Sequence, residues 1–403
     1  MRLRHSLFCA LALLALAACA GARAGAPGGA QLTPALRPHA STSPSPYPQI
    51  SVENAYKIPA GSGAFVQNGK LFWFPVASKN GTSTTAFDAF DPANGKLESY
   101  KTSGAAYRVV AMTAGTGGTT WFAAQGASAL LGQIGPRGAL TTYAVPTPGN
   151  EYAAGIAHTP TGVKFFTYTL TDNDATTTNY LCTFDAASGT VTQTKVSGIA
   201  SPAPFLAATS AGTTLYVASG GGLAEVTAKG VATAYPSPKP LAGDSIVPGN
   251  VLIAHDGSLR LALTAFPSGG GDNTPYIATF SIADQSWRYT LAGDSPTGEV
   301  VNGIALAPDE TLWFSTSLPT AAIGKLSPAG GATWFSVPSK YQGGTGTIVV
   351  DGANIWLQEL DVPQTGAKPV SYLIEFSASK PTVRRAPAAL QRSALAGRRR
   401  TRR

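Results

Sequence analysis

A unit of about 47 residues recurs seven times along this chain, and this period limits the possible folds more than any other feature. In each unit a turn precedes an aromatic or bulky position by three or four residues. The marker positions are Phe72, Trp121, Phe165, Leu215, Arg260, Trp313 and Trp356, spaced by 49, 44, 50, 45, 53 and 43 residues. Arg260 is the poorest match. This spacing suits the four-stranded blade of a β-propeller, roughly 40 to 50 residues long.

The segments around the markers have the pattern of short strands. Gly303–Leu306 and Thr311–Ser315 are β-rich runs on either side of the turn residues Pro308 and Asp309, which is typical of a hairpin. A third strand recurs, as in Ala322–Leu326, and a fourth ends several units with an aromatic residue and a Pro three residues later. We therefore predict an all-β fold, a seven-bladed β-propeller of four-stranded antiparallel blades.

One copy of the fourth strand lies out of order. Tyr56-Lys57-Ile58-Pro59 resembles the end of a blade, yet it precedes the first complete unit. We predict that this segment is the outer strand of the last blade, because it would cover an edge that is otherwise exposed. The alternative closure uses Thr382 to Arg385 as that strand.

The N-terminal segment has the pattern of an export signal. Arg2 and Arg4 precede the apolar run Leu7–Ala18, which is too short to span a bilayer. Leu16-Ala17-Ala18-Cys19 resembles a bacterial lipobox, which predicts a signal peptide over 1–18, lipidation of Cys19 and membrane anchoring in the cell envelope. The alternative is a cut after Ala20 or Ala22, with Cys19 incidental.

The rest of the chain divides into three parts by composition. Residues 19–49 are rich in Pro, Ala and Ser and are expected to form a tether. The propeller is predicted over 50–383 and a basic tail over 384–403. Eight of the 29 basic residues are arginines of that tail, which leaves 21 basic against 21 acidic residues elsewhere. A neutral body with a basic tail gives no reason to expect specific nucleic-acid binding.

Cysteine usage agrees with an exported lipoprotein. Cys9 is lost with the signal and Cys19 is acylated, so Cys182 remains alone and no intramolecular disulfide is possible. Cys182 lies in an apolar run and is expected to be buried and unreactive.

The clearest repeat resembles that of a known enzyme family. Its motifs are Gly303-Ile304-Ala305, Pro308-Asp309, Trp313-Phe314, Ile323-Gly324-Lys325-Leu326, Pro328-Ala329-Gly330 and Phe335-Ser336-Val337-Pro338. They are similar to the repeat of the virginiamycin B (streptogramin B) lyase family, which has a Pro-Asp-Gly turn and Trp-Phe-Thr-Glu, Ile-Gly and Tyr-x-x-Pro strands. The resemblance covers about Ile50 to Ala386 and implies a seven-bladed propeller, although fold and chemistry are separable.

The resemblance also implies ester elimination that uses Mg²⁺ and a His base at the mouth of the channel. The family's functional histidines lie just before or at the inner strand, and the corresponding positions 108–110, 152–154, 300–302 and 344–346 contain no His. His158 and His255 lie within the propeller but do not match the base position. Each is a candidate for a catalytic base or a metal ligand, and the alternative is a structural or surface role.

At the Glu position of the family's Trp-Phe-Thr-Glu strand, only the seventh unit has an acidic residue, Glu359. The other units have Pro75, Ala124, Tyr168, Ala218, Leu263 and Thr316 at this position. Glu359 is a weak catalytic and metal candidate, or else a solvated residue at a loop end. One carboxylate does not make a divalent site, which normally needs several oxygen ligands.

Three functions remain open, and one of them, a purely structural envelope protein, cannot be separated by sequence from the first of the two that follow. The first is an envelope-tethered propeller that binds a small molecule or protein at one face, without streptogramin lyase activity. The second is a lyase or lactonase-type enzyme that acts on a cyclic ester, lactone or glycan. No cofactor is expected in the first case, and Mg²⁺ only in the second. The sequence leaves the oligomeric state open.

Overall fold

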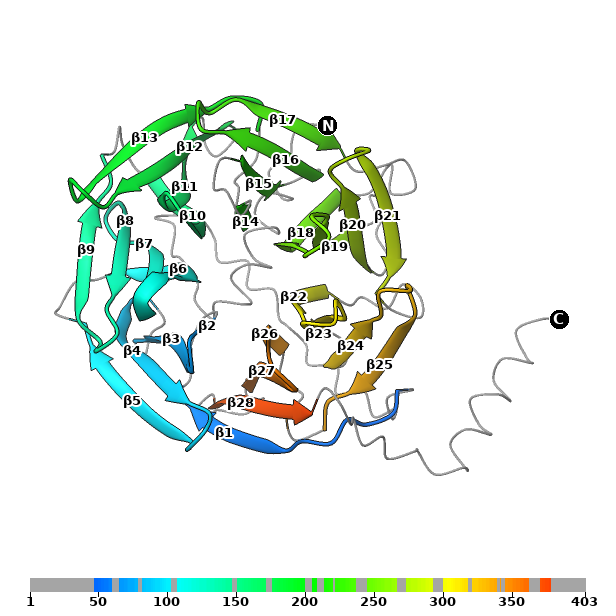
Figure 1. The fold of residues 1–403 in the computed structure, drawn as a ribbon. Coiled ribbons are helices and arrows are strands. Elements are labelled where there is room, and N and C mark those ends of the chain that lie inside the picture. Colours follow the sequence, from blue (N-terminus) through cyan, green and yellow to red (C-terminus); the bar gives the residue numbers. More distant parts are fainter. Residues whose placement is uncertain are drawn as a thin grey trace, which may run out of the picture.

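The computed structural model describes residues 47–59, 65–78, 82–102, 107–146, 151–171, 176–199, 205–208, 214–219, 222–236, 245–266, 273–292, 300–317, 321–338, 341, 345–361 and 370–377. Seven four-stranded antiparallel sheets lie radially around one axis (Figure 1). The predicted seven-bladed β-propeller is therefore confirmed. Among the described residues, no helix is long and apolar enough to cross a membrane.

Six blades are made of four consecutive strands each, which follow one another from the inner to the outer edge. Blade 1 holds β2 (Val66–Asn68), β3 (Leu71–Ala77), β4 (Thr84–Asp91) and β5 (Lys96–Lys101); blade 2 holds β6 (Arg108–Ala114), β7 (Thr120–Gln125), β8 (Ala129–Ile134) and β9 (Leu140–Ala144); blade 3 holds β10 (Glu151–Thr159), β11 (Gly162–Thr171), β12 (Thr176–Asp185) and β13 (Thr190–Val196). Blade 4 holds β14 (Phe205–Ala208), β15 (Thr214–Ser219), β16 (Gly222–Thr227) and β17 (Ala232–Pro236); blade 5 holds β18 (Ser245–Ile253), β19 (Leu259–Phe266), β20 (Thr274–Ser281) and β21 (Ser286–Leu291); blade 6 holds β22 (Val300–Leu306), β23 (Leu312–Ser317), β24 (Ala322–Leu326) and β25 (Ala332–Ser336). One 3₁₀ turn, η1 (Thr116–Gly118), lies between β6 and β7.

Blade 7 joins the two ends of the ring. Its strands, from the inside outward, are β26 (Thr345–Asp351), β27 (Asn354–Asp361), β28 (Val370–Ser377) and β1 (Asn54–Ile58). Strand β1 is antiparallel to β28, with Tyr56 opposite Leu373. The predicted closure by the N-terminal strand is confirmed. The alternative segment, Thr382 to Arg385, lies outside the described residues.

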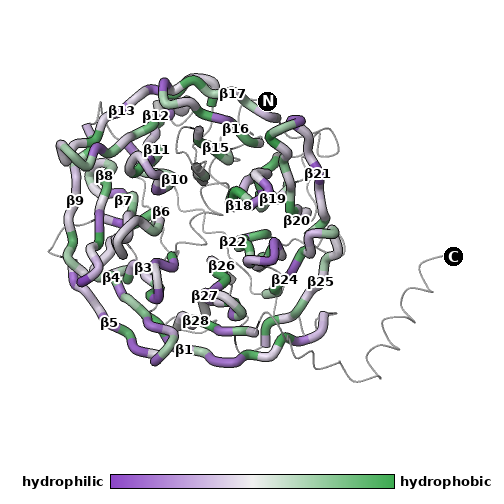
Figure 2. Tube along the Cα trace, viewed as in Figure 1, coloured by the Kyte–Doolittle hydropathy of each residue, from purple (hydrophilic) through white to green (hydrophobic). Residues whose placement is uncertain are grey.

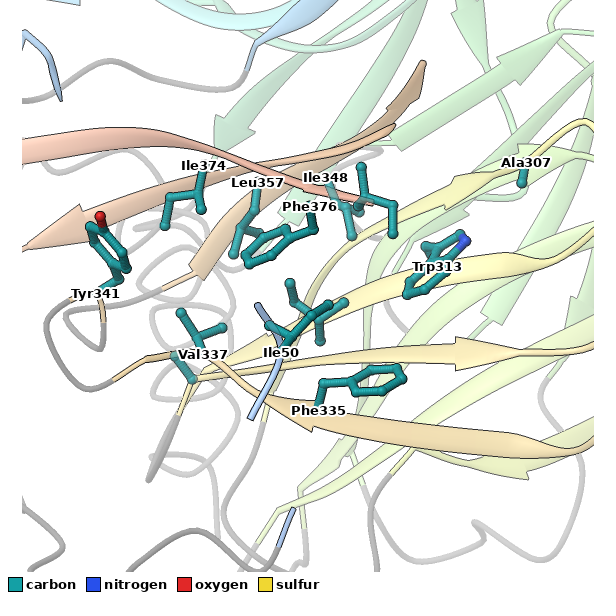
Figure 3. Packing of buried hydrophobic residues seen from close by; sticks show 13 residues of the cluster. Ile50, Ala307, Trp313, Phe335, Val337, Tyr341, Ile348, Leu357, Ile374 and Phe376 are labelled. Atoms are coloured by element: carbon teal, nitrogen blue, oxygen red, sulfur yellow. The ribbon is translucent and has the colours of Figure 1, made fainter. Parts of the chain in front are cut away.

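The chain contacts the ring before β1 begins. Ser336 at the end of β25 donates its N–H to Pro48 (2.9 Å) and accepts from the N–H of Ile50 (3.1 Å). The Tyr47 ring stacks on Trp334, with centroids 5.6 Å apart. Ile50 lies among buried side chains of blades 6 and 7 (Figure 3). Residues 47–49, which the sequence placed in the tether, thus cover the outer edge of blade 6.

Large aromatic residues fill the space between neighbouring blades. Four of the aromatic markers, Trp121, Phe165, Trp313 and Trp356, are buried. Arg260 occupies the same second-strand position in blade 5, where it pairs with Asp256 instead of filling the interface with an aromatic ring. The marker positions therefore identify the second strand of each blade, including the weakest repeat.

The inner strands define two ends of the ring. We call the end at which they begin the entry end, and the end at which they turn into the second strands the hairpin end. Five inner strands (β6, β10, β18, β22 and β26) carry a bulge or register shift near the entry end. Such bulges re-aim side chains and are common near functional sites.

Candidate functional site

The three candidate residues predicted from sequence do not come together. Glu359 lies near the entry end of blade 7, opposite Thr345, the first residue of β26. His158 lies near the hairpin end of blade 3, one residue before Thr159 closes the β10–β11 pairing with Gly162. His255 lies in the hairpin turn of blade 5. The residues therefore occupy three blades and both ends of the ring.

Glu359 is a buried strand residue. Its exposed fraction is 0%, and it lies inside β27 between Thr345 on β26 and Tyr372 on β28. The expected loop-end position is wrong, because the blade continues past the Trp-Phe-Thr-Glu position to Asp361. Neither register partner is a carboxylate, so the described residues around Glu359 do not fit a Mg²⁺ site, which needs several oxygen ligands.

The two histidines have different surroundings. His158 is partly buried, and burial lowers the pKa of its imidazole because it disfavours the charged form. The His255 side chain is 77% exposed, and its Nδ1 lies 2.5 Å from Oε1 of Glu310. Among the described residues, no group of three or more His, Cys, Asp or Glu side chains is placed to hold a metal ion.

The most distinctive feature of the entry end is an exposed aromatic ring on β10. Tyr152 is 40% exposed. Its ring stacks on the buried ring of Tyr168, its register partner on β11, with centroids 5.3 Å apart and an interplanar angle of 23°. The stack holds one face of Tyr152 against the protein, and the exposed part can meet a ligand.

A glutamine of the preceding blade fixes the backbone on both sides of Tyr152. Gln125, at the end of β7, donates from Nε2 to the carbonyl oxygen of Glu151 (2.9 Å), and its Oε1 accepts from the N–H of Ala153 (2.9 Å). Gln125 is also the register partner of Arg108 at the start of β6. The side-chain amide of Gln125 thus bonds to the backbone of β10 as a neighbouring strand would. It links blades 2 and 3 and brings the first residues of β6 and β10 close together.

A buried polar cluster lies behind this rim. The carboxyl group of Glu151, 1% exposed, accepts from Nε2 of Gln193 (2.6 Å), and Nε2 also lies 3.2 Å from Oγ1 of Thr167. Burial raises the pKa of Glu151, and the hydrogen bonds from Gln193 and Thr167 act in the opposite direction. Cys182 lies 3.6 Å from Thr167, and burial raises the pKa of its thiol to about 12. The expected burial of Cys182 is confirmed, and the raised pKa agrees with an unreactive thiol.

Together these contacts define a rim at the entry end of blades 2 and 3, made of Arg108, Gln125, Glu151, Tyr152 and Tyr168. We call it the tyrosine rim. It offers a partly exposed aromatic surface on a fixed backbone, which suits stacking against a ligand. Sequence reasoning missed it for two reasons: a search for His and paired acids passes over Tyr152, and the role of Gln125 depends on a contact between blades.

The fold and this rim define a seven-bladed β-propeller with a candidate binding surface at one end. A chain in the crystal structure of the mitotic checkpoint complex is similar in fold, with a TM-score of 0.55 and 12% identity; the match covers 83% of this chain and 98% of that one. At this identity the likeness shows the fold alone. No known protein family matches the sequence, and no curated protein matches it.

Proposed function

We propose that this protein is a membrane-tethered β-propeller of the bacterial cell envelope that binds a small molecule or protein partner at the tyrosine rim. The observation that supports this most directly is the 40% exposed ring of Tyr152, held by the Tyr168 stack and by Gln125. Binding, rather than turnover of a streptogramin-type ester, is its principal activity.

The rigidity of Tyr152 favours a binding role. Tyrosine contributes a large contact area and loses little conformational entropy on binding, and it is enriched among the residues that dominate interfaces. The backbone on both sides of Tyr152 is fixed by the bidentate contact with Gln125. A ligand that stacks on this ring therefore does not have to order it first, which reduces the cost of association.

The comparison and the sequence support the remaining parts of the proposal. A propeller chain of similar fold is part of an assembly, the mitotic checkpoint complex, and a propeller offers two faces for binding. The apolar run Leu7–Ala18 followed by Cys19 supports export and lipidation. A bacterial lipoprotein carries several acyl chains, and stable anchoring needs more than one.

Site-specific photo-crosslinking tests the binding surface in intact cells. A benzophenone amino acid at position 152 should give a discrete adduct, either a crosslinked protein or a defined mass increase. The matched control is position 97, because Leu97 on the outer strand β5 is 39% exposed. The same adducts at both positions, or none at 152, would contradict the proposed surface.

The anchor is tested separately. The mature protein should begin at a lipid-modified Cys19, seen by mass spectrometry of the membrane fraction. Cys19→Ala should move the protein to the soluble fraction, and an unmodified N-terminus at another residue would reject lipidation without affecting the binding test.

A further inference from the structure

An apolar recess opens at the hairpin end of the ring, away from the tyrosine rim. Its volume is about 360 Å³, and its lining comes from the last residues of three neighbouring inner strands, β18, β22 and β26. The lining residues are Leu252, Ile253, Ile304, Ala305, Leu306, Ile348, Val349 and Val350. All eight are apolar, and Figure 2 shows hydrophobic colour on these three strands. A recess of this volume can accept a few apolar side chains.

The turns beside this recess are acidic. At the hairpin end of blades 5 to 7, the turns and the strand ends next to them carry Asp256, Asp284, Asp309, Glu310 and Asp351. Two of these acids already have partners, because Asp256 pairs with Arg260 and Glu310 with His255. The corresponding positions of blades 1 to 4 carry Lys70, Lys96, Arg137 and Lys229 against Asp91 and Asp185. Among the described residues, negative charge is thus concentrated on the side of the ring that holds the recess.

The last residue that the structure describes lies at the hairpin end of blade 7, on the same end of the ring as the recess. Ser377, the last residue of β28, is opposite Asn354 at the hairpin end of blade 7. The 26 residues that follow contain eight arginines and no acidic residue. Two apolar stretches, Ala386–Leu390 and Ala394–Ala396, alternate with those arginines. Leu390 is 13 residues beyond Ser377, and at roughly 3.3 Å per residue it can reach across the hairpin end of a blade to the inner strands.

We propose that the C-terminal segment 384–403 docks on the hairpin end of blades 5 to 7, with its apolar residues in the recess and its arginines against the acidic turns. The segment has both the apolar and the basic character that this surface requires. Such docking covers one end of the ring and leaves the tyrosine rim accessible. It does not depend on the identity of the ligand at that rim.

Limited trypsin digestion of the full mature chain tests the docking, because the arginines are the cleavage sites. Cleavage after Arg392 at low salt should be at least fivefold slower than in a synthetic peptide of residues 378–403. The difference should shrink in about 1 M salt, where the screening length falls to about 3 Å. Equal rates in protein and peptide at low salt would overturn the proposal.

Matched substitutions locate the surface. Asp309→Asn combined with Asp351→Asn should remove most of the protection. The control is Asp91→Asn combined with Asp185→Asn on the other side of the ring, which should leave it intact. Asp309, Asp91 and Asp185 each accept from a backbone N–H two residues on, at 3.0, 3.0 and 2.9 Å, and Asn keeps such a bond.

The contact between the recess and the apolar residues of the C-terminal segment is tested by Leu306→Ser, which should also speed cleavage. Leu306 is partly exposed, so the change is expected to leave the ring folded.

Three results would overturn the proposal. Loss of protection on dilution would show that the tail of a second copy is the occupant, and protection only in the presence of anionic phospholipid vesicles would assign the tail to the membrane. Equal effects of the two double substitutions would show that the location is wrong.

Discussion

Replacement of Trp356 by Ala should weaken the closure of the ring more than the same replacement of Trp313. Both indoles are 1% exposed and occupy the same position in neighbouring blades. Trp356 lies in the joint between blades 7 and 1, where its ring is within 6.0 Å of Tyr56, 5.1 Å of Phe72 and 5.8 Å of Phe90.

The expected magnitude follows from these contacts. Removal of a buried Trp typically costs about 3 to 5 kcal/mol of unfolding free energy. The Trp313 ring has one aromatic neighbour, Phe335 at 6.4 Å, among the ring pairs of the described residues, and Trp356 has three. At about 0.5 to 1.5 kcal/mol for each ring pair, Trp356→Ala should cost roughly 1 to 3 kcal/mol more.

Urea unfolding and native-state hydrogen exchange together measure this difference. The unfolding midpoint should fall further for Trp356→Ala than for Trp313→Ala. The amides that pair β1 with β28 should exchange faster in Trp356→Ala and stay near wild type in Trp313→Ala. Equal losses in the two variants, with unchanged exchange in β1, would refute the idea that this aromatic cluster closes the ring.

Three further results are expected. Burial raises the pKa of Asp88, which is 2% exposed, above its usual value of 3.8. Ionisation of this carboxyl group therefore costs stability as the pH rises from about 3.8. Asp88→Asn should raise the urea midpoint at pH 7 and flatten its pH dependence above about pH 3.8, and an unchanged profile would contradict this. Gln125→Leu leaves two backbone groups without their partner and should cost about 1 to 3 kcal/mol by urea unfolding; a loss below the experimental error would show that the contact is dispensable. Incubation with virginiamycin B and Mg²⁺ should give no linearised product by mass spectrometry, and Mg²⁺-dependent turnover abolished by His158→Ala or Glu359→Ala would reverse the functional proposal.

Much of the fold could be predicted because its determinants are local. Turn residues followed by an aromatic marker recur at blade spacing, and that pattern locates the second strand even in blade 5, where Arg260 pairs with Asp256. The out-of-order strand Tyr56–Pro59 was recognisable because it resembles the last strand of other units. The docking of residues 47–49 on β25 was not, because a Pro-rich segment with one parallel bridge to Ser336 has no periodic pattern.

The candidate site was much harder to predict. The tyrosine rim depends on the register between blades 2 and 3, which places the amide of Gln125 against the backbone on both sides of Tyr152. No local spacing carries that information. Glu359 illustrates a second difficulty: the resemblance of its repeat to a known motif does not show that the residue is enclosed by β26 and β28.

The pairing of β1 with β28 also determines when the protein can finish folding. Asn54 and Glu375, which are hydrogen-bonded in blade 7, are 321 residues apart. Closing a loop of that length in an unstructured chain costs on the order of 5 kcal/mol, so the six consecutive blades are expected to form first and bring the two strands together. If the chain is exported from its N-terminus, β1 reaches the outside long before its partner. Its edge then stays open until the last blade arrives, so the ring is most open to aggregation and proteolysis at the end of translocation.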